Sequence, residues 1–356
     1  MNKIIPIQYL SAHLFFIFGW ISFYYSGVFS YSLVLYGFVL LPFLELLIPR
    51  KTKFFLLSLD QEKNSFLYDF ILYLTIPFQY LSIFYFLYTI SHFELTTYEL
   101  VGKVLSMGIL CGHAINVAHE LGHRKNKFEQ FLSKTLLLST LYMHFFIEHN
   151  KGHHLKVATS QDPASAKKGE WLYIFFIRSI FYQYKSAWEI ENKRLKAKKM
   201  RVVSIYNEMI QFLMIQFTLL LIIYFVLNFF AVLMFCIASF FGIIILETIN
   251  YVEHYGLVRK LKENGRHEAV TEFHSWNSDF ILGRLFFFQL TLHSDHHMKS
   301  TKKYQKLVSW DSAPQHPTGY PGMMLLAFFP PLFFFCMDGL VDYYTKIKDK
   351  SREQYN

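Results

Sequence analysis

The chain has 356 residues, of which 53% are hydrophobic, 19% aromatic and only 17% charged. Because an ordinary soluble domain carries about 25% charged residues, this composition excludes a disordered chain, a disulfide scaffold and a plain cytosolic enzyme. It predicts an integral membrane protein. The net charge of +9 and the 16 histidines do not follow from membrane residence and need their own explanation.

Six segments are apolar and long enough to cross a bilayer as helices, for which about 20 residues are needed. The first is too long for a signal peptide and is expected to stay as an anchor. Asn228 interrupts the longest apolar stretch and marks the turn between the fifth and sixth spans. The predicted spans lie near 9–27, 32–48, 66–90, 98–118, 203–226 and 230–250.

Three shorter apolar stretches, 131–147, 171–181 and 323–337, are expected to be interfacial or membrane-dipping helices. Pro330 and Pro331 break the last of them. No repeat, low-complexity tract or linker divides the chain, so residues 1–356 are predicted to form a single domain. The expected fold is all-α and integral to the membrane, with a cytoplasmic helical cap.

The loops differ in charge, since the even-numbered connections carry Lys and Arg and the odd-numbered ones carry none. By the positive-inside rule, both termini and the region 119–200 are cytoplasmic. A polybasic stretch in that region either attracts anionic lipid headgroups or docks an acidic protein. The loop residues are Arg50, Lys51, Lys53, Lys63, Arg124, Lys125 and Lys127, and the stretch comprises Lys193, Arg194, Lys196, Lys198, Lys199 and Arg201.

Eight histidines fall into three compact boxes, all in segments predicted to meet at the cytoplasmic face: HELGH at 119–123, HNKGHH at 149–154 and HSDHH at 293–297. Eight imidazoles exceed what one tetrahedral zinc can use, but they suit two octahedral-type metals with open positions. The isolated histidines are expected to be hydrogen-bonded core residues: His13, His92, His113, His144, His267 and His316.

The spacing predicts which histidines share a metal, because residues three or four apart lie on one face of an α-helix. The second histidine of each doublet is rotated by about a quarter turn and is free to reach another metal. The expected pairs are His119 with His123, His149 with His153, and His293 with His296, which leaves His154 and His297 for a second metal.

The first box alone also matches the H-E-x-x-H pattern of zinc peptidases, in which Glu120 would be the general base. A membrane zinc protease is therefore an alternative. It would use the two histidines of that box and one further ligand, so it leaves most of the second and third boxes unexplained.

The order of the boxes resembles the membrane fatty acid desaturase and hydroxylase superfamily. The flanking residues are similar to those of the membrane alkane 1-monooxygenases, from about the third span to Gly322. The elements that carry this resemblance are NVAHELGHR at 116–124, EHNKGHH at 148–154, VAT at 157–159, DPAS at 162–165, NYVEHYGL at 250–257, HSWNS at 274–278, PQHP at 314–317 and GYPG at 319–322.

The resemblance implies a ninth ligand, His254, and two non-haem irons that use O₂ to hydroxylate the terminal carbon of a medium- or long-chain alkane. It also implies a separate rubredoxin and rubredoxin reductase as electron donors, and a multi-pass protein of the inner membrane in contact with lipid. Nucleic acid is not expected as a partner. The alternatives within the superfamily are an acyl-lipid desaturase and a xylene-type monooxygenase acting on aromatic methyl groups.

Several polar residues near the boxes are expected to orient the imidazole N–H groups rather than bind the irons: Glu120, Glu148, Asp162, Glu253, His274 and Asp295. The chain departs from the family pattern at Thr291 and Leu292, where Gln-Arg is usual, and at His316, where Leu is usual. Basic residues beside the third box are a second candidate surface for an acidic electron carrier: Lys299, Lys302, Lys303 and Lys306.

Overall fold

The computed structural model describes residues 5–48 and 65–353. Within these ranges every regular element is a helix, and strand-like pairing is limited to two isolated bridges. The predicted all-α fold is therefore confirmed. Four basic residues of the second connection lie outside the described residues: Arg50, Lys51, Lys53 and Lys63.

Six helical segments are long and apolar enough to cross a membrane, which confirms the expected number. The turn predicted at Asn228 separates the fifth from the sixth. Its side chain accepts a hydrogen bond from the backbone N–H of Ala231 at 2.9 Å and so caps the sixth helix. The segments are Pro6–Tyr24, Gly27–Leu47, Phe66–His92, Thr97–Gly122, Glu208–Val226 and Phe229–His254.

The first two spans are built from several short helical pieces, and the other four are continuous α-helices. The pieces of the first two are η1 (Pro6–His13), α1 (Leu14–Tyr24), η2 (Gly27–Tyr31), α2 (Ser32–Leu35), η3 (Tyr36–Leu40) and α3 (Leu41–Leu47). The continuous spans are α4 (Ser65–His92), α5 (Thr97–Gly122), α10 (Glu208–Val226) and α11 (Phe229–His254).

The other helices do not keep the bounds of the three short segments that the sequence predicted. The stretch 131–147 divides into two helices, and the helix that begins at Leu172 continues to Ala197. The last helix begins at Pro330, since the first turn of a helix tolerates proline. These elements are α6 (Lys127–Leu138), α7 (Phe145–Glu148), η5 (His149–His153), α8 (His154–Lys156), α9 (Leu172–Ala197), η6 (Glu272–His274), α12 (Ile281–Phe286), α13 (His293–Met298), η7 (Tyr304–Lys306), α14 (Tyr320–Ala327) and α15 (Pro330–Glu353).

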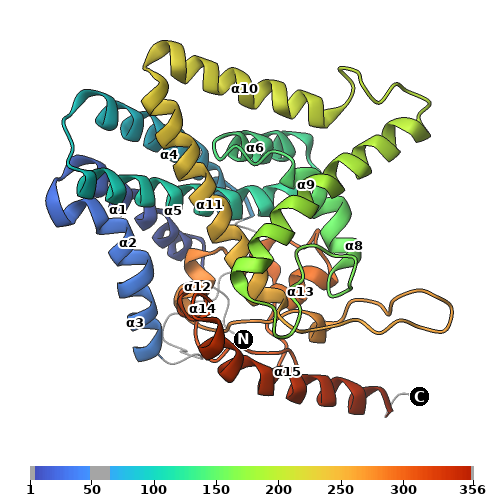
Figure 1. Cartoon of the computed structure of the whole chain (residues 1–356). Coiled ribbons are helices and arrows are strands. Elements are labelled where there is room, and N and C mark those ends of the chain that lie inside the picture. Colours follow the sequence, from blue (N-terminus) through green and yellow to red (C-terminus); the bar gives the residue numbers. More distant parts are fainter. Residues whose placement is uncertain (1–4, 49–64, 354–356) are drawn as a thin grey trace.

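Helix α5 runs through the middle of the molecule, where it packs against α1, α4 and α11 (Figure 1). Helix α10 lies at one edge and contacts α11. The short helices α12, α13 and α14 gather where α11 ends. The C-terminal ends of the two central spans are thereby brought beside the C-terminal third of the chain.

Glycines allow α5 and α11 to approach closely. A Cβ atom on Gly242 would lie 2.5 Å from Cβ of Cys111 and 3.0 Å from the backbone nitrogen of Gly112. A Cβ on Gly108 would lie 2.4 Å from the ring of Phe241. Small residues permit such backbone contact between membrane helices. The contact holds the two helix ends in a defined relation to each other.

Replacing Gly242 with leucine is expected to destabilise the protein, because backbone atoms of α5 occupy the space that the new Cβ needs. Overpacking costs about 1–3 kcal/mol, so the thermal transition in detergent should fall by several degrees. Gly339→Leu on α15 is the control, since a Cβ there meets no atom within 4 Å. An unchanged transition for Gly242→Leu would contradict the close contact.

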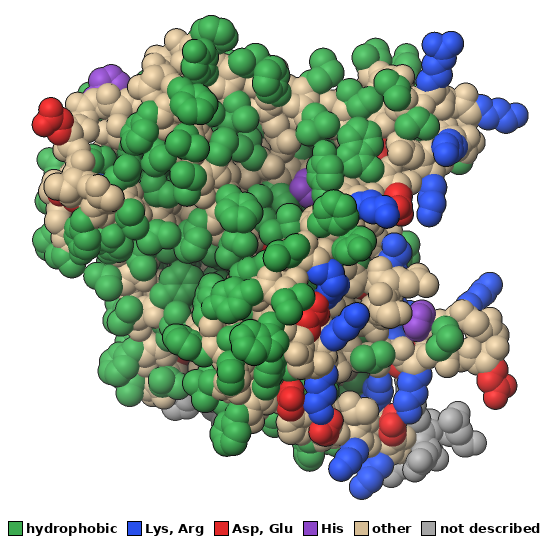
Figure 2. Space-filling model, viewed as in Figure 1, with side chains coloured by type: hydrophobic (Ala, Val, Ile, Leu, Met, Phe, Trp, Pro, Cys, Tyr) green, Lys and Arg blue, Asp and Glu red, His purple; other side chains and the backbone are tan. Residues whose placement is uncertain are grey.

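The surface divides into an apolar and a basic part. Figure 2 shows hydrophobic side chains covering the side formed by α1, α2, α4 and α10, and Lys and Arg gathered on the opposite side. On α10, Phe217, Phe225 and Val226 are 62%, 78% and 73% exposed. Such exposure is costly in water but not in lipid. The division matches a membrane protein whose basic residues lie on one side.

Candidate metal centre

Nine buried or half-buried histidines converge into two adjacent groups, each of which could hold a metal ion. In each group the available ring nitrogens all lie within 4.8 Å of one another. None of the six isolated histidines belongs to either group, as expected for the part of the chain that the structure describes. The first group is His119, His123, His149, His154 and His296, and the second is His153, His254, His293 and His297.

The first box lies in the last turn of α5. His119 and His123 are four residues apart, and because this segment is α-helical they face the same way, with ring centroids 4.7 Å apart. They belong to one group, as the spacing predicted. Their position at the end of a buried span explains why they point into the protein.

The second box does not pair as predicted. His149 and His153 were expected together, but His149 lies with His154, at 3.0 Å between their Nε2 atoms, and His153 joins the other group. The reason is that residues 149–153 form one turn of π-helix, η5. In a π-helix the hydrogen bond links residues five apart, so residues i and i+5 rather than i and i+4 share a face.

The third box is also divided differently from the prediction. His293 and His297 lie in the second group with Nε2 atoms 2.9 Å apart, and His296 reaches the first group. On the short α-helix α13, a step of four residues brings side chains closer to alignment than a step of three, because each residue turns by about 100°. His296 therefore projects toward His119, with ring centroids 4.6 Å apart.

His254 is the last residue of α11, and its Nε2 lies 3.1 Å from Nε2 of His293. This places it in the second group. Its other ring nitrogen, Nδ1, lies 3.5 Å from the hydroxyl of Ser275. Ser275, in the segment that precedes α12, thus contacts the ring nitrogen of His254 that is not directed at His293.

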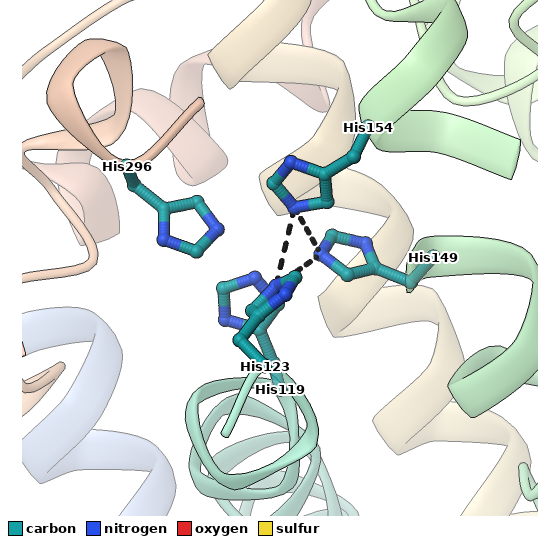
Figure 3. Close-up of side chains that lie close together, drawn as sticks. All are labelled: His119, His123, His149, His154 and His296. Carbon is teal, nitrogen blue, oxygen red and sulfur yellow. Dashed lines mark hydrogen bonds between the residues drawn. The ribbon is translucent and has the colours of Figure 1, made fainter. Parts of the chain in front are cut away.

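The spacing of the nitrogens suits a six-coordinate ion. With a metal–nitrogen bond of about 2.1 Å, neighbouring ligands lie about 3.0 Å apart in an octahedron and about 3.4 Å apart in a tetrahedron. The Nε2 atoms of His123, His149 and His154 are separated by 3.0–3.1 Å. Figure 3 shows the five rings of the first group directed toward one another from three segments of the chain.

Two ring nitrogens of this group have no hydrogen-bond partner among the described residues, Nε2 of His119 and Nε2 of His296. Buried polar atoms without a partner are rare, and a cation would satisfy both lone pairs. The donor set and its orphaned nitrogens therefore fit a metal.

Burial lowers the pKa of most histidines of the two groups that lie outside the spans, and neighbouring imidazoles lower it further. The effect brings the pKa of His296 to about 3. His153 is an exception: burial alone would lower its pKa, but the carboxylate of Asp162, together with those of Glu148 and Glu247, raises it. Neutral rings offer the lone pair that a metal needs. The others with a lowered pKa are His123, His149, His154, His293 and His297.

Asp162 supports His153 directly. Its Oδ2 accepts a hydrogen bond from Nδ1 of His153 at 2.9 Å and another from the hydroxyl of Ser165 at 2.6 Å. The pair leaves Nε2 of His153 facing the second group, 3.3 Å from Nε2 of His297. This is the arrangement expected of a carboxylate that orients a metal-binding imidazole. Ser165 was not singled out from the sequence, although it lies in the DPAS element.

Changing Asp162 to asparagine is expected to lower metal affinity about 10–100-fold, because loss of such a partner weakens the ligand that it holds. Metal content after graded exposure to a chelator measures this. Glu189→Gln, at an exposed carboxylate on α9, is the matched control. Wild-type resistance to the chelator in Asp162→Asn would show that the carboxylate does not position His153.

Glu253 occupies a different place from the one predicted for an outer partner. Its Oε2 lies 3.1 Å from Nε2 of His293, the ring nitrogen that faces the second group. The carboxylate is therefore on the inner side of the ring, where a ligand would lie. The acidic residue before His254 in the motif is the sequence feature that marks this position.

In the described part of the chain, no hydrogen bond joins the side chains of the four remaining candidates to the nine rings, although the charges of Glu148 and Asp295 act to raise the pKa of His153 and His296. Glu120 binds Arg124 at 2.6 Å, and Asp295 binds Trp310 at 3.0 Å. His274 pairs with Glu268 at 2.9 Å. Glu148 is buried beside Gly152, and burial together with Asp162 raises its pKa to about 8.

A narrow apolar path leads from the centre into the membrane-spanning region. One cavity of ≈ 20 Å³ touches His119, His149 and His293, and a second of ≈ 40 Å³ lies farther along. Both are lined by Gly112, Asn116 and Ile249, so they adjoin. The far cavity is also lined by Phe15, Gly37, Phe38, Ile109, His113, Ile245, Phe287, Pro321 and Met324. The sequence alone could not show which of the many apolar residues form this path.

The residues that depart from the family pattern belong to neither of the two histidine groups. Thr291 and Leu292 are buried directly before α13, and the backbone carbonyl of Thr291 accepts a hydrogen bond from the N–H of Ser278 at 2.8 Å. The ring of His316 stacks on Trp276 with centroids 5.3 Å apart. His316 thus packs as an aromatic residue, which explains why it can replace an apolar one.

Comparison with known proteins places these features in context. Residues 96–326 match the fatty acid desaturase family. The chain is 40% identical over 287 residues to alkane 1-monooxygenase 1 of Alcanivorax borkumensis, covering 80% of this chain and 70% of the relative. It is 38% identical over 304 residues to alkane 1-monooxygenase of Pseudomonas putida, covering 83% and 75%. A xylene/toluene monooxygenase hydroxylase component from Pseudomonas putida is 27% identical over 241 residues, covering 66% and 63%.

Proposed function

Since this chain belongs to the fatty acid desaturase family and, within it, to the alkane 1-monooxygenases, we propose that it hydroxylates medium- and long-chain alkanes at a terminal carbon. The observation that carries the proposal is an apolar path that ends on two histidine groups. One oxygen atom of O₂ is inserted into a C–H bond and the other leaves as water. The balance is RH + O₂ + 2 e⁻ + 2 H⁺ → ROH + H₂O.

The nine histidines would hold two iron ions, five rings to one and four to the other. Bound iron supplies the activation of O₂ that breaking an unactivated C–H bond requires. The chain contributes the position of each donor: α5 and α11 present His119, His123 and His254 at their ends, and Asp162 holds the ring of His153. The carboxylate of Glu253 lies within reach of the second group.

Substrate recognition rests on apolar burial, because an alkane offers neither charge nor hydrogen bonds. Each methylene removed from water contributes about 0.8 kcal/mol. The cavities are narrow, so a bound chain would displace side chains such as Phe38 and Phe287, which are only partly buried. Since the path stops at the histidines, the end of the chain rather than its middle reaches the reacting position.

Electrons would come from a rubredoxin reduced by its reductase, because two electrons per turnover have to enter from outside. The termini and the metal centre would lie on the cytoplasmic side of the inner membrane, where the basic residues gather. The whole chain would act as a single domain, since one helical assembly supplies both the spans and the histidines.

A direct test uses the purified protein in liposomes with rubredoxin, its reductase, NADH and O₂. Octane should yield 1-octanol, and the protein should contain about two irons per chain. His297→Ala is the control for reaction at the metal centre, with no product expected. Xylene is tested alongside octane, because the 27% identical relative is a xylene/toluene monooxygenase hydroxylase component.

Three results would overturn the proposal. Oxidation of xylene but not of octane would favour an aromatic-methyl monooxygenase, and a new double bond in added acyl lipid would favour a desaturase. One zinc per chain, with full function in His297→Ala, would favour a zinc enzyme.

A further inference from the structure

A polar pocket of ≈ 340 Å³ is lined by Asp162 and shares no lining residue with the two apolar cavities of the path. Its wall includes four basic side chains and two carboxylates: Lys156, Lys167, Arg178, Lys185, Asp162 and Glu189. Arg178 is held by Glu170 at 2.6 Å. Lys167 and Lys185 are exposed and Lys156 is half-buried, so their charges face the exterior.

The floor of this pocket is connected to the second histidine group by short contacts. Asp162 lines the pocket, and its Oδ2 is 2.9 Å from Nδ1 of His153. Nε2 of His153 is then 3.3 Å from Nε2 of His297. The pocket is therefore connected to His297 of the second group through Asp162 and the ring of His153, by two contacts of hydrogen-bond length. No other pocket described above combines a basic wall with such a connection.

The pocket is the centre of a larger basic surface. The C-terminal half of α9 continues it with the exposed Lys193 and Lys196, and the protruding loop 258–270 carries the exposed Lys260, Lys262 and Arg266. This loop is tied to the pocket segment by Arg259, whose Nη1 donates to the carbonyl of Leu155 at 3.0 Å. Figure 2 shows the basic side of the molecule hollowed between the ends of these two projections.

The lysines beside the third box form a weaker surface for an acidic partner. Lys302 is 2.5 Å from Asp295, and Lys303 is 2.6 Å from Asp69. Two of the four lysines are thus neutralised within the protein, and only Lys299 and Lys306 are exposed. The polybasic stretch of α9 has the pair of Arg194 with Glu191. The basic surface around the pocket also has ion pairs, Lys185 with Glu189 at 3.9 Å and Lys260 with Asp349 at 2.6 Å, but within the described residues Lys156 and Lys167 form none.

We propose that this basic hollow, defined by Lys156, Lys167, Lys185 and the loop 258–270, is the docking site of a small acidic one-electron iron–sulfur protein. The inference rests on the proposed function, which needs such a donor. The reduced carrier would dock twice per turnover, be oxidised by one electron each time, and pass that electron through Asp162 and His153 to the second group. Complementary charge guides and holds such weak redox complexes.

The test compares two double charge reversals. Lys156→Glu with Lys167→Glu alters the hollow, and Lys299→Glu with Lys306→Glu alters the other basic surface to the same extent. For the first variant the KM for reduced rubredoxin should rise about tenfold or more at low salt, with kcat at saturating rubredoxin within about twofold of wild type. The second variant should keep the wild-type KM, and added salt should raise the KM of wild type more than that of the first variant.

A single-turnover measurement separates this proposal from the proposed function. Protein reduced chemically without rubredoxin, then mixed with O₂ and octane, should give the same yield of 1-octanol for wild type and both variants. A wild-type KM in the Lys156/Lys167 variant, or a raised KM in the Lys299/Lys306 variant alone, would overturn the docking site. No alkanol from chemically reduced wild type would overturn the proposed function instead, and anisotropy of labelled rubredoxin would still test the docking.

Discussion

His153→Ala and His154→Ala are expected to remove different metals from the same protein, although the two residues are neighbours in the chain. Each variant should fall from about two irons per chain to about one, and hydroxylation should fall at least about 100-fold in both, since loss of an outer partner alone costs 10–100-fold. The reason is the π-helical turn η5, which sends His154 to the first group and His153 to the second.

Mössbauer spectra of protein loaded with ⁵⁷Fe measure which iron is lost. The two sites differ in donor number, five against four, so they should give distinguishable signals. His297→Ala should reproduce the spectrum of His153→Ala, and His149→Ala should reproduce that of His154→Ala. If His149→Ala instead matched His153→Ala, the α-helical pairing would be right and the grouping seen here wrong.

His144→Ala is the matched control for these variants. His144 precedes the second box by five residues and is buried, but its ring packs against Tyr142 and Tyr184 and belongs to neither group. The variant should therefore keep both irons. Its use separates loss of a ligand from general damage to this segment.

Gly37→Leu is expected to lower kcat/KM for long alkanes relative to short ones. Gly37 lines the far cavity, and a Cβ on it would meet only Phe15, at 3.9 Å, which is ordinary van der Waals contact. A leucine side chain can therefore fill the cavity without moving the backbone. Each methylene excluded from burial costs about 0.8 kcal/mol, or about fourfold in kcat/KM.

The measurement is kcat/KM along a series from hexane to hexadecane in liposomes. The ratio of the hexadecane value to the hexane value should fall about tenfold or more, which corresponds to two excluded methylenes. Gly339→Leu adds the same side chain far from the path and should leave the ratio unchanged. An unchanged ratio in Gly37→Leu would show that long chains do not lie in this cavity.

The spans could be predicted because a helix in lipid has to be continuously apolar over its length. Two spans were predicted to end too early, at the helix ends that carry histidines of the metal centre. The fourth span was expected to end near residue 118 and the sixth near 250, but α5 continues to Gly122 and α11 to His254. Hydropathy falls at His119 and Glu253, yet these polar side chains face the protein interior, so the helix does not need to stop.

The pairing of the histidines could not be predicted from spacing alone. A rule based on 3.6 residues per turn is correct for His119 with His123, where the helix is regular. It fails for His149 with His153, because one π-helical turn changes the direction of every side chain after it. Nothing in the residue types of HNKGHH distinguishes the two helix types.

The sequence by itself determined the membrane setting, the number of spans and the eight boxed histidines as ligand candidates, because hydrophobic length and ligand spacing are properties of residues along the chain. His254 was indicated only by the family resemblance of the motif around it. Only the tertiary structure decided which histidines lie together, that Asp162 supports His153 and Glu253 faces His293, and which apolar residues line the path. These relations join segments far apart in the chain. They depend on helix type and on the close packing of α5 with α11, which residue spacing does not encode.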